Sequence, residues 1–127
     1  MEPHHPPNLE GLRILIVDDE ILIASDLQDS FQEAGAEVVG PFSSVRQAVA
    51  CAKNEDLSAA ILDFRVGRDT TVEVAQMLDS RQIPYIFYSG QGVSPELHDQ
   101  MPDARFLMKP ARYGALMRAM QELVGRA

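Results

Sequence analysis

The chain has 127 residues, 46% of them hydrophobic, which fits a single domain with one core. Its formal net charge of −8 argues against binding to nucleic acid or to an anionic membrane surface, because either would require a basic patch. The single cysteine, Cys51, excludes an internal disulfide, no apolar run is long enough to span a bilayer, and residues 1–10 contain no apolar signal region. We therefore expect a cytoplasmic protein without nucleic-acid or membrane partners.

The first elements in chain order are a tail, a strand and a helix. The proline-rich residues 1–11 are expected to be a flexible tail, and residues 12–127 to form the domain. Residues 12–17 are a nearly continuous apolar run, which is typical of a strand buried in a parallel sheet. From Glu20 apolar residues recur at helical spacing until Gly35, which predicts an amphipathic helix.

The middle of the chain repeats this alternation. Residues 36–40 predict a second strand, and Ser43 or Ser44 can cap the helix that follows. The apolar residues 59–62 predict a third, buried strand. A polar loop through Asp69 then leads to a helix whose apolar face contains Val74, Ala75 and Leu78.

The last part of the chain adds two more strands. Residues 85–88 predict a fourth strand, followed by a glycine-rich loop over 89–94 and a short helix that Pro95 can open. Residues 105–108 predict a fifth strand. The final helix carries apolar residues at i, i+3 and i+4 spacing, namely Tyr113, Leu116, Met117, Met120, Leu123 and Val124.

Five strand–helix units in so short a chain predict an α/β fold with a doubly wound, five-stranded parallel sheet. Ligands and chemistry gather beyond the carboxyl ends of the strands in such sheets. The polar residues that follow the predicted strands at this edge are Asp18, Asp19, Asp63, Ser89 and Lys109.

These residue types suit the transfer of a phosphoryl group. Three carboxylates at one edge repel each other, and a hard cation such as Mg²⁺ relieves the repulsion while leaving positions open for phosphate oxygens. A carboxylate can itself attack phosphorus and form an aspartyl phosphate. Lys109 provides a positive charge for one phosphate oxygen, and the hydroxyl of Ser89 a hydrogen bond for another.

Four short motifs carry a resemblance to a known family. They are Ile16-Val17-Asp18-Asp19-Glu20, Ile61-Leu62-Asp63, Tyr88-Ser89-Gly90 and Met108-Lys109-Pro110. In this order and spacing they resemble the receiver domain of bacterial two-component response regulators, over roughly residues 12–126. The resemblance implies a single flavodoxin- and receiver-like domain with strand order 2-1-3-4-5.

The resemblance also implies a role for each site residue. Asp63 would be the phosphoacceptor, receiving the phosphoryl group from a histidine of a kinase or phosphotransfer protein. Asp18, Asp19, Asp63 and the backbone carbonyl of Arg65 would hold Mg²⁺. The protein would then be a switch that takes part only in its own phosphorylation and dephosphorylation, not an enzyme acting on other substrates.

Other family features concern the response to phosphorylation. Ser89 would follow the phosphoryl group, Lys109 would pair with it, and the peptide bond before Pro110 would be cis. Phe106 falls where an aromatic swings inward on activation, although plain core packing explains it equally well. These movements would reshape the face formed by the fourth helix, fifth strand and fifth helix for a downstream protein target.

The sequence departs from the family pattern at the phosphoacceptor loop. Gly67 stands where members usually carry proline, so we expect a more mobile loop. Arg65 places a long cation beside the site, where it can contact phosphate or change the lifetime of the phosphorylated state. The segment 87–92 resembles a variant group of receivers that reads roughly Phe-Ala-Thr-Gly there.

Three other functions fit the sequence less well. A flavin or nucleotide binder needs a glycine- or hydroxyl-rich loop after the first strand, but Asp18-Asp19-Glu20 would repel an anion there. A phosphatase with an aspartate nucleophile tends to need an acid two residues later, where this chain has Arg65. A phosphorylation-independent pseudo-receiver is favoured by an incomplete acidic set, whereas the set here is complete.

The sequence does not determine how a signal would be passed on from this domain. The chain is expected to be either a stand-alone receiver, which we favour because Met1 and the untagged tail look native, or a domain cut from a hybrid histidine kinase or a longer regulator. We expect a monomer or a weak dimer.

Overall fold

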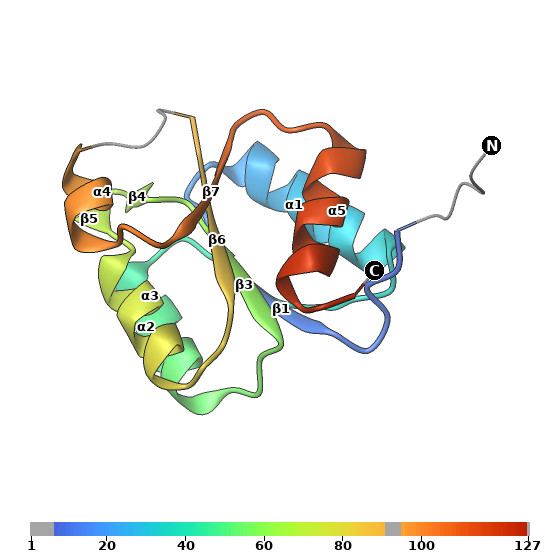
Figure 1. Cartoon of the computed structure of the whole chain (residues 1–127), viewed down its shortest axis with the longest axis horizontal. Coiled ribbons are helices and arrows are strands. Elements are labelled where there is room, and N and C mark those ends of the chain that lie inside the picture. Colours follow the sequence, from blue (N-terminus) through green and yellow to red (C-terminus); the bar gives the residue numbers. More distant parts are fainter. Residues whose placement is uncertain (1–6, 91–94, 127) are drawn as a thin grey trace.

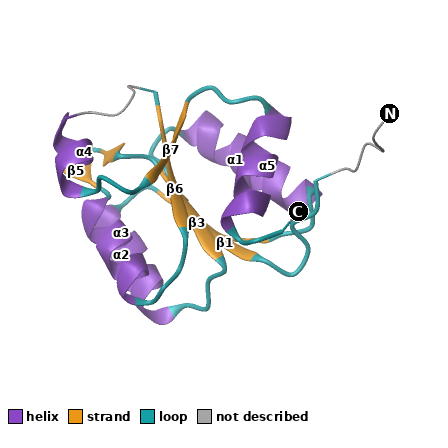
Figure 2. Ribbon diagram, in the orientation of Figure 1, coloured by secondary structure: helices purple, strands orange, loops and turns teal. Residues whose placement is uncertain are grey.

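The computed structural model describes residues 7–90 and 95–126, in which a five-stranded sheet lies between two layers of helices (Figure 1, Figure 2). Neighbouring strands are all parallel, in the order β2-β1-β3-β6-β7. The strands are β1 (Arg13–Val17), β2 (Glu37–Phe42), β3 (Ala59–Leu62), β6 (Tyr85–Ser89) and β7 (Arg105–Met108). The predicted doubly wound sheet with strand order 2-1-3-4-5 is therefore confirmed.

The helices divide between the two faces of the sheet (Figure 1). One face is covered by α1 (Ile21–Glu33) and α5 (Tyr113–Leu123). The other is covered by α2 (Val45–Asn54), α3 (Val72–Ser80) and α4 (Pro95–Gln100). None of the helices in the described part of the chain has the length and apolar character needed to cross a bilayer.

The two faces are filled by alternate residues of the same strands. In β1, Ile14 and Ile16 pack in the cluster beneath α1 and α5, whereas Leu15 and Val17 pack in the cluster beneath α2 and α3. Burial on both sides explains why the central strands read as continuous apolar runs and not as alternating ones.

Strand β2 extends further than the predicted 36–40. Its register to β1 shifts between the pairs Leu15–Val39 and Val17–Phe42, so the strand contains a bulge and continues to Phe42. Gly40 lies in this bulge at a φ of +102°, and a Cβ built there would lie 2.9 Å from the carbonyl oxygen of Ile16. The bulge lets the Phe42 carbonyl accept a hydrogen bond from the N–H of Asp18, at 3.0 Å.

The polar loop expected after Asp63 is instead a small antiparallel hairpin of β4 (Arg65–Val66) and β5 (Asp69–Thr70). Gly67 begins its two-residue turn at a φ of +62°, a conformation that glycine adopts without strain. The Gly67 N–H donates to Asp19 Oδ2 at 2.8 Å, which ties the turn to the loop after β1.

The flexible tail predicted over residues 1–11 includes a residue that is part of the core. Leu9 is fully buried in the cluster beneath α1 and α5, and its N–H donates to the carbonyl of Ala34 at 2.8 Å. A single apolar residue among prolines gave no periodic signal, so the sequence did not reveal this contact. Part of the predicted glycine-rich loop, residues 91–94, lies outside the described residues.

Candidate phosphoacceptor site

The candidate site lies at the carboxyl ends of the central strands. Asp18 directly follows β1, Asp63 directly follows β3, Ser89 ends β6 and Lys109 directly follows β7. Hydrogen bonds align these ends: the Asp63 N–H donates to the Val17 carbonyl at 2.8 Å, and the Lys109 N–H donates to the Ser89 carbonyl at 2.9 Å. The parallel register thus gathers residues that are up to 91 positions apart in the chain, as the sequence predicted.

Lys109 is the cation at the centre of this group. Its Nζ lies 2.8 Å from Asp18 Oδ2, 3.1 Å from Asp63 Oδ2 and 3.2 Å from Glu20 Oε1. The side chains of Lys109, Asp18 and Asp63 are 6%, 1% and 9% exposed, so these ion pairs are shielded from water. Such contacts are held only when the charges compensate each other, because burial of an isolated charge is costly.

Burial and charge shift the pKa values of this group. Burial raises the pKa of Asp63, the carboxylate of Asp18 raises it further, and the ammonium of Lys109 offsets part of the effect. Burial alone would lower the pKa of Lys109, but the ion pair with Asp18 and the charge and hydrogen bond of Asp63 outweigh it, and the net pKa lies above the usual value. Lys109 is therefore a firmly charged cation, while Asp63 is a carboxylate that another cation would stabilise.

The oxygen atoms of Asp18, Glu20 and Asp63 form a set that fits a divalent cation. One oxygen from each lies within 4.8 Å of the others. Asp18 Oδ1 accepts a hydrogen bond from the Glu20 N–H at 2.9 Å. Asp18 Oδ2 is buried and has no well-directed hydrogen-bond donor among the described residues, although the Lys109 charge lies 2.8 Å away. A hard cation that binds carboxylate oxygens, such as Mg²⁺, fits this arrangement.

Glu20 is the member of this group that sequence reasoning missed. It follows the Asp18-Asp19 pair in the sequence but is not among the predicted metal ligands. The structure does not bring Asp19 into the cluster: Asp19 is exposed, and its Oδ2 accepts the Gly67 N–H. A role for Asp19 and for the Arg65 carbonyl in metal binding stays a prediction.

The structure also gives the surroundings of the other predicted residues. Ser89 is buried at the end of β6. Phe106 is half-buried, is paired in register with Phe87, and packs against the core beneath α2 and α3. The peptide bond between Lys109 and Pro110 is cis, as the resemblance implied. The exposed guanidinium of Arg65 forms an ion pair with Glu96 of α4 at 2.8 Å.

Tyr88 is a further residue that sequence reasoning did not single out. Its hydroxyl accepts a hydrogen bond from the Ala111 N–H at 3.0 Å, and Lys109 Nζ lies 5.7 Å from the centre of its ring. The buried ring thus fixes the segment that carries Lys109 and adds a cation–π contact to it. An aromatic in a buried strand carries no sequence signal for this role.

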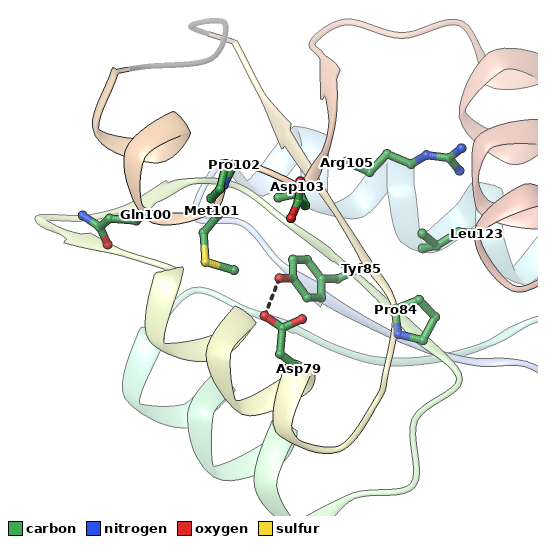
Figure 3. Close-up of a pocket in the computed structure, with 10 residues that line it drawn as sticks. Asp79, Pro84, Tyr85, Gln100, Met101, Pro102, Asp103, Arg105 and Leu123 are labelled. Atoms are coloured by element: carbon green, nitrogen blue, oxygen red, sulfur yellow. Dashed lines mark hydrogen bonds between the residues drawn. The ribbon is translucent and has the colours of Figure 1, made fainter.

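A hollow of about 470 Å³ lies away from these groups (Figure 3). It is found where β6 begins, at Tyr85, whose hydroxyl donates to Asp79 Oδ2 at 2.9 Å. Because Tyr85 and Ser89 are at opposite ends of β6, this hollow is at the amino ends of the strands and is separate from the acidic cluster.

Comparisons with known proteins agree with the geometry. The sequence model of one protein family, the response regulator receiver domain, matches residues 14–121 of this chain. The transcriptional regulatory protein PdtaR of Mycobacterium tuberculosis is 29% identical over an alignment of 117 residues that covers 90% of this chain and 57% of PdtaR. This chain therefore spans little more than half the length of that relative.

Two solved structures share the fold. A response regulator receiver protein from Sinorhizobium medicae superposes with a TM-score of 0.80 at 24% identity, over 92% of this chain and 97% of that one. The second is the receiver domain of a sensor histidine kinase from Pseudomonas aeruginosa, solved with a magnesium ion coordinated in its active site cleft. It superposes with a TM-score of 0.79 at 20% identity, over 91% of this chain and 98% of that one.

Proposed function

The chain belongs to the response regulator receiver domain family of two-component systems, and we propose that it is a phosphoacceptor switch in which Asp63 takes a phosphoryl group from a phosphohistidine. The observation that carries the proposal is the position of Asp63. It is buried at the end of β3, lies 3.1 Å from the ammonium of Lys109, and shares an oxygen cluster with Asp18 and Glu20. A carboxylate so placed is both a nucleophile and a cation ligand.

In the proposed reaction a carboxylate oxygen of Asp63 forms a bond to phosphorus. The bond between phosphorus and the donor histidine nitrogen breaks, and its electron pair stays on the imidazole of the donor. Lys109 neutralises charge that gathers on the phosphoryl oxygens, and the hydroxyl of Ser89 donates to one of them. Bound Mg²⁺ supplies further neutralisation of the phosphoryl oxygens.

The proposed metal ligands come from both lines of reasoning. The closeness of one oxygen each from Asp18, Asp63 and Glu20 supports Asp18 and Asp63 as ligands, and we add Glu20 as a direct or water-mediated ligand. Asp19 and the backbone carbonyl of Arg65 are proposed on the family resemblance. A magnesium ion coordinated in the cleft of the Pseudomonas aeruginosa receiver domain supports a metal at this edge of the sheet.

We propose that the chain acts in the cytoplasm, with a histidine kinase or phosphotransfer protein as phosphoryl donor and a downstream protein as its target. Movement of Ser89 toward the phosphoryl group, and of Phe106 behind it, would alter the surface of α4, β7 and α5. Phe106 is half-buried on the edge strand β7 and packs against the core beneath α2 and α3, a position that supports such a movement. We propose that the chain acts as a monomer or weak dimer.

Intact mass after incubation with acetyl phosphate tests this proposal. We expect a single phosphoryl adduct that requires Mg²⁺, is labile to base, and is absent from Asp63→Asn. Asp56→Asn is the matched control, because Asp56 is exposed and lies before β3, at the far end of that strand. An adduct on Asp63→Asn would place the nucleophile elsewhere. The lack of an adduct with acetyl phosphate and with a phosphorylated histidine donor would instead support a pseudo-receiver.

A further inference from the structure

The backbone of Arg65 lies close to Asp63 in the chain, while its side chain contacts α4. It begins β4, two residues after Asp63. The hairpin that carries it is anchored on both sides: the Gly67 N–H donates to Asp19 Oδ2, and the hydroxyl of Thr71 donates to the Asp63 carbonyl at 2.6 Å. The backbone of Arg65 is thus fixed relative to Asp63, and only its long side chain is free to change position.

The side chain of Arg65 is paired with α4. Its Nη2 lies 2.8 Å from Oε2 of Glu96, in the first turn of that helix, and its guanidinium lies 5.4 Å from the centre of the Phe64 ring. Both partners of the ion pair are about half exposed, at 53% and 44%. Pairs this exposed shift an equilibrium by up to about fivefold and are easily exchanged for a stronger partner. In Figure 1 the β4–β5 hairpin lies beside α4.

Phosphorylation would place a stronger partner within the neighbourhood of Arg65. The site holds four acidic side chains, from Asp18, Asp19, Glu20 and Asp63, against the single ammonium of Lys109. An acyl phosphate adds about one further negative charge and three acceptor oxygens at Asp63. A guanidinium is always charged and binds phosphate oxygens through paired N–H groups, more strongly than it binds an exposed carboxylate.

We propose that Arg65 is a second phosphoryl-binding cationic side chain besides Lys109, held by Glu96 before phosphorylation and transferred to the phosphoryl group afterwards. This inference rests on the proposed function of Asp63. The exchange breaks the contact between Arg65 and Glu96 and forms one between Arg65 and a phosphoryl oxygen, without any change in covalent bonds. Its consequence is that phosphorylation removes one of the contacts that hold the first turn of α4, whose Leu97 stays buried in the core.

Binding of the phosphoryl mimic beryllofluoride, with Mg²⁺ present, tests the exchange on the whole chain. Arg65→Gln should bind it at least about tenfold more weakly, because a charge-assisted contact is lost. Glu96→Gln should bind it up to about fivefold more tightly, because no resting pair has to be broken. The double variant should behave like Arg65→Gln alone, because Glu96 acts only through Arg65.

Matched controls are Arg68→Gln, an exposed arginine in the same hairpin, and Asp99→Asn, an exposed acid on the same helix. Both should bind the mimic as the wild type does. Hydrogen exchange of α4 gives a second readout. Exchange should quicken on addition of the mimic in the wild type, and should already be quick without it in Arg65→Gln and Glu96→Gln.

The outcomes separate this inference from the function on which it rests. If the wild type takes neither the mimic nor a phosphoryl group, the proposed function of Asp63 fails. If the wild type binds the mimic but Arg65→Gln binds equally well, Arg65 is not a phosphoryl ligand. If Glu96→Gln does not bind more tightly, or its α4 exchanges as slowly as that of the wild type, Glu96 is not the resting partner.

Discussion

Replacement of Lys109 by methionine should strongly destabilise the metal-free protein at neutral pH. Lys109 Nζ lies within 3.2 Å of three carboxylates, two of which belong to the buried Asp18 and Asp63. Two unit charges about 3 Å apart attract by about 5 kcal/mol at an effective dielectric constant of 20, and burial of the charges offsets much of this. Removal of one partner from a buried pair typically costs about 3–5 kcal/mol, which is the loss of unfolding free energy that we expect.

The loss should depend on pH. Because the pKa of Asp63 is raised in the folded state, its ionisation lowers stability as the pH rises through that pKa. Without Lys109 the pKa of Asp63 rises further, so the destabilisation should decrease from pH 7 to pH 5 as the protonated fraction of Asp63 increases. Mg²⁺ should restore much of the stability at pH 7, because it replaces the missing positive charge.

Urea unfolding followed by far-UV circular dichroism, at pH 5 and pH 7 with and without Mg²⁺, measures these differences. Lys53→Met is the matched control, because Lys53 is exposed on α2, and it should change stability by less than about 0.5 kcal/mol. A loss below about 1 kcal/mol for Lys109→Met at pH 7 would refute the reasoning. So would a loss that is equal at both pH values and insensitive to Mg²⁺.

Three further predictions concern neighbouring features. Gly40→Ala should lower the unfolding free energy by about 2 kcal/mol or more in urea titrations, because φ is +102° and the new Cβ would lie 2.9 Å from the Ile16 carbonyl oxygen. Gly114→Ala, where a Cβ meets nothing within 4 Å, should instead be neutral or stabilising by up to about 1 kcal/mol. Thr71→Val should cost about 1 kcal/mol in the same assay and Thr71→Ser much less, because the fully buried hydroxyl donates to the Asp63 carbonyl. Mg²⁺ should raise the melting temperature of the wild type by several degrees in calorimetry but not that of Asp63→Asn, and an equal rise in both would remove Asp63 from the metal site.

The strands and the chemistry at their ends were predictable because each is encoded locally. Strands β1 and β3 are apolar on both faces, so their sequences alone mark them as central. Once the five strands are parallel, the residues after them must share an edge, and this brings Asp18, Asp63 and Lys109 together without further information.

What could not be predicted depends on contacts between distant segments. The bulge in β2 is set by the close approach of Gly40 to β1, and Leu9 is buried only because the surface beside Ala34 is there to receive it. Likewise Glu20, not Asp19, enters the oxygen cluster because the hairpin turn captures Asp19 through Gly67. The sequence around the adjacent Asp19 and Glu20 contains no local signal that says which of them joins the oxygen cluster.

Reductive trapping tests most directly whether Asp63 carries the phosphoryl group. Borohydride converts an aspartyl phosphate to homoserine, and peptide mass spectrometry then locates the converted residue. After incubation with acetyl phosphate and Mg²⁺, we predict homoserine at position 63, with none when Mg²⁺ is removed. Conversion at another aspartate, with position 63 intact in a phosphorylated sample, would contradict the assignment of Asp63 as the phosphoacceptor.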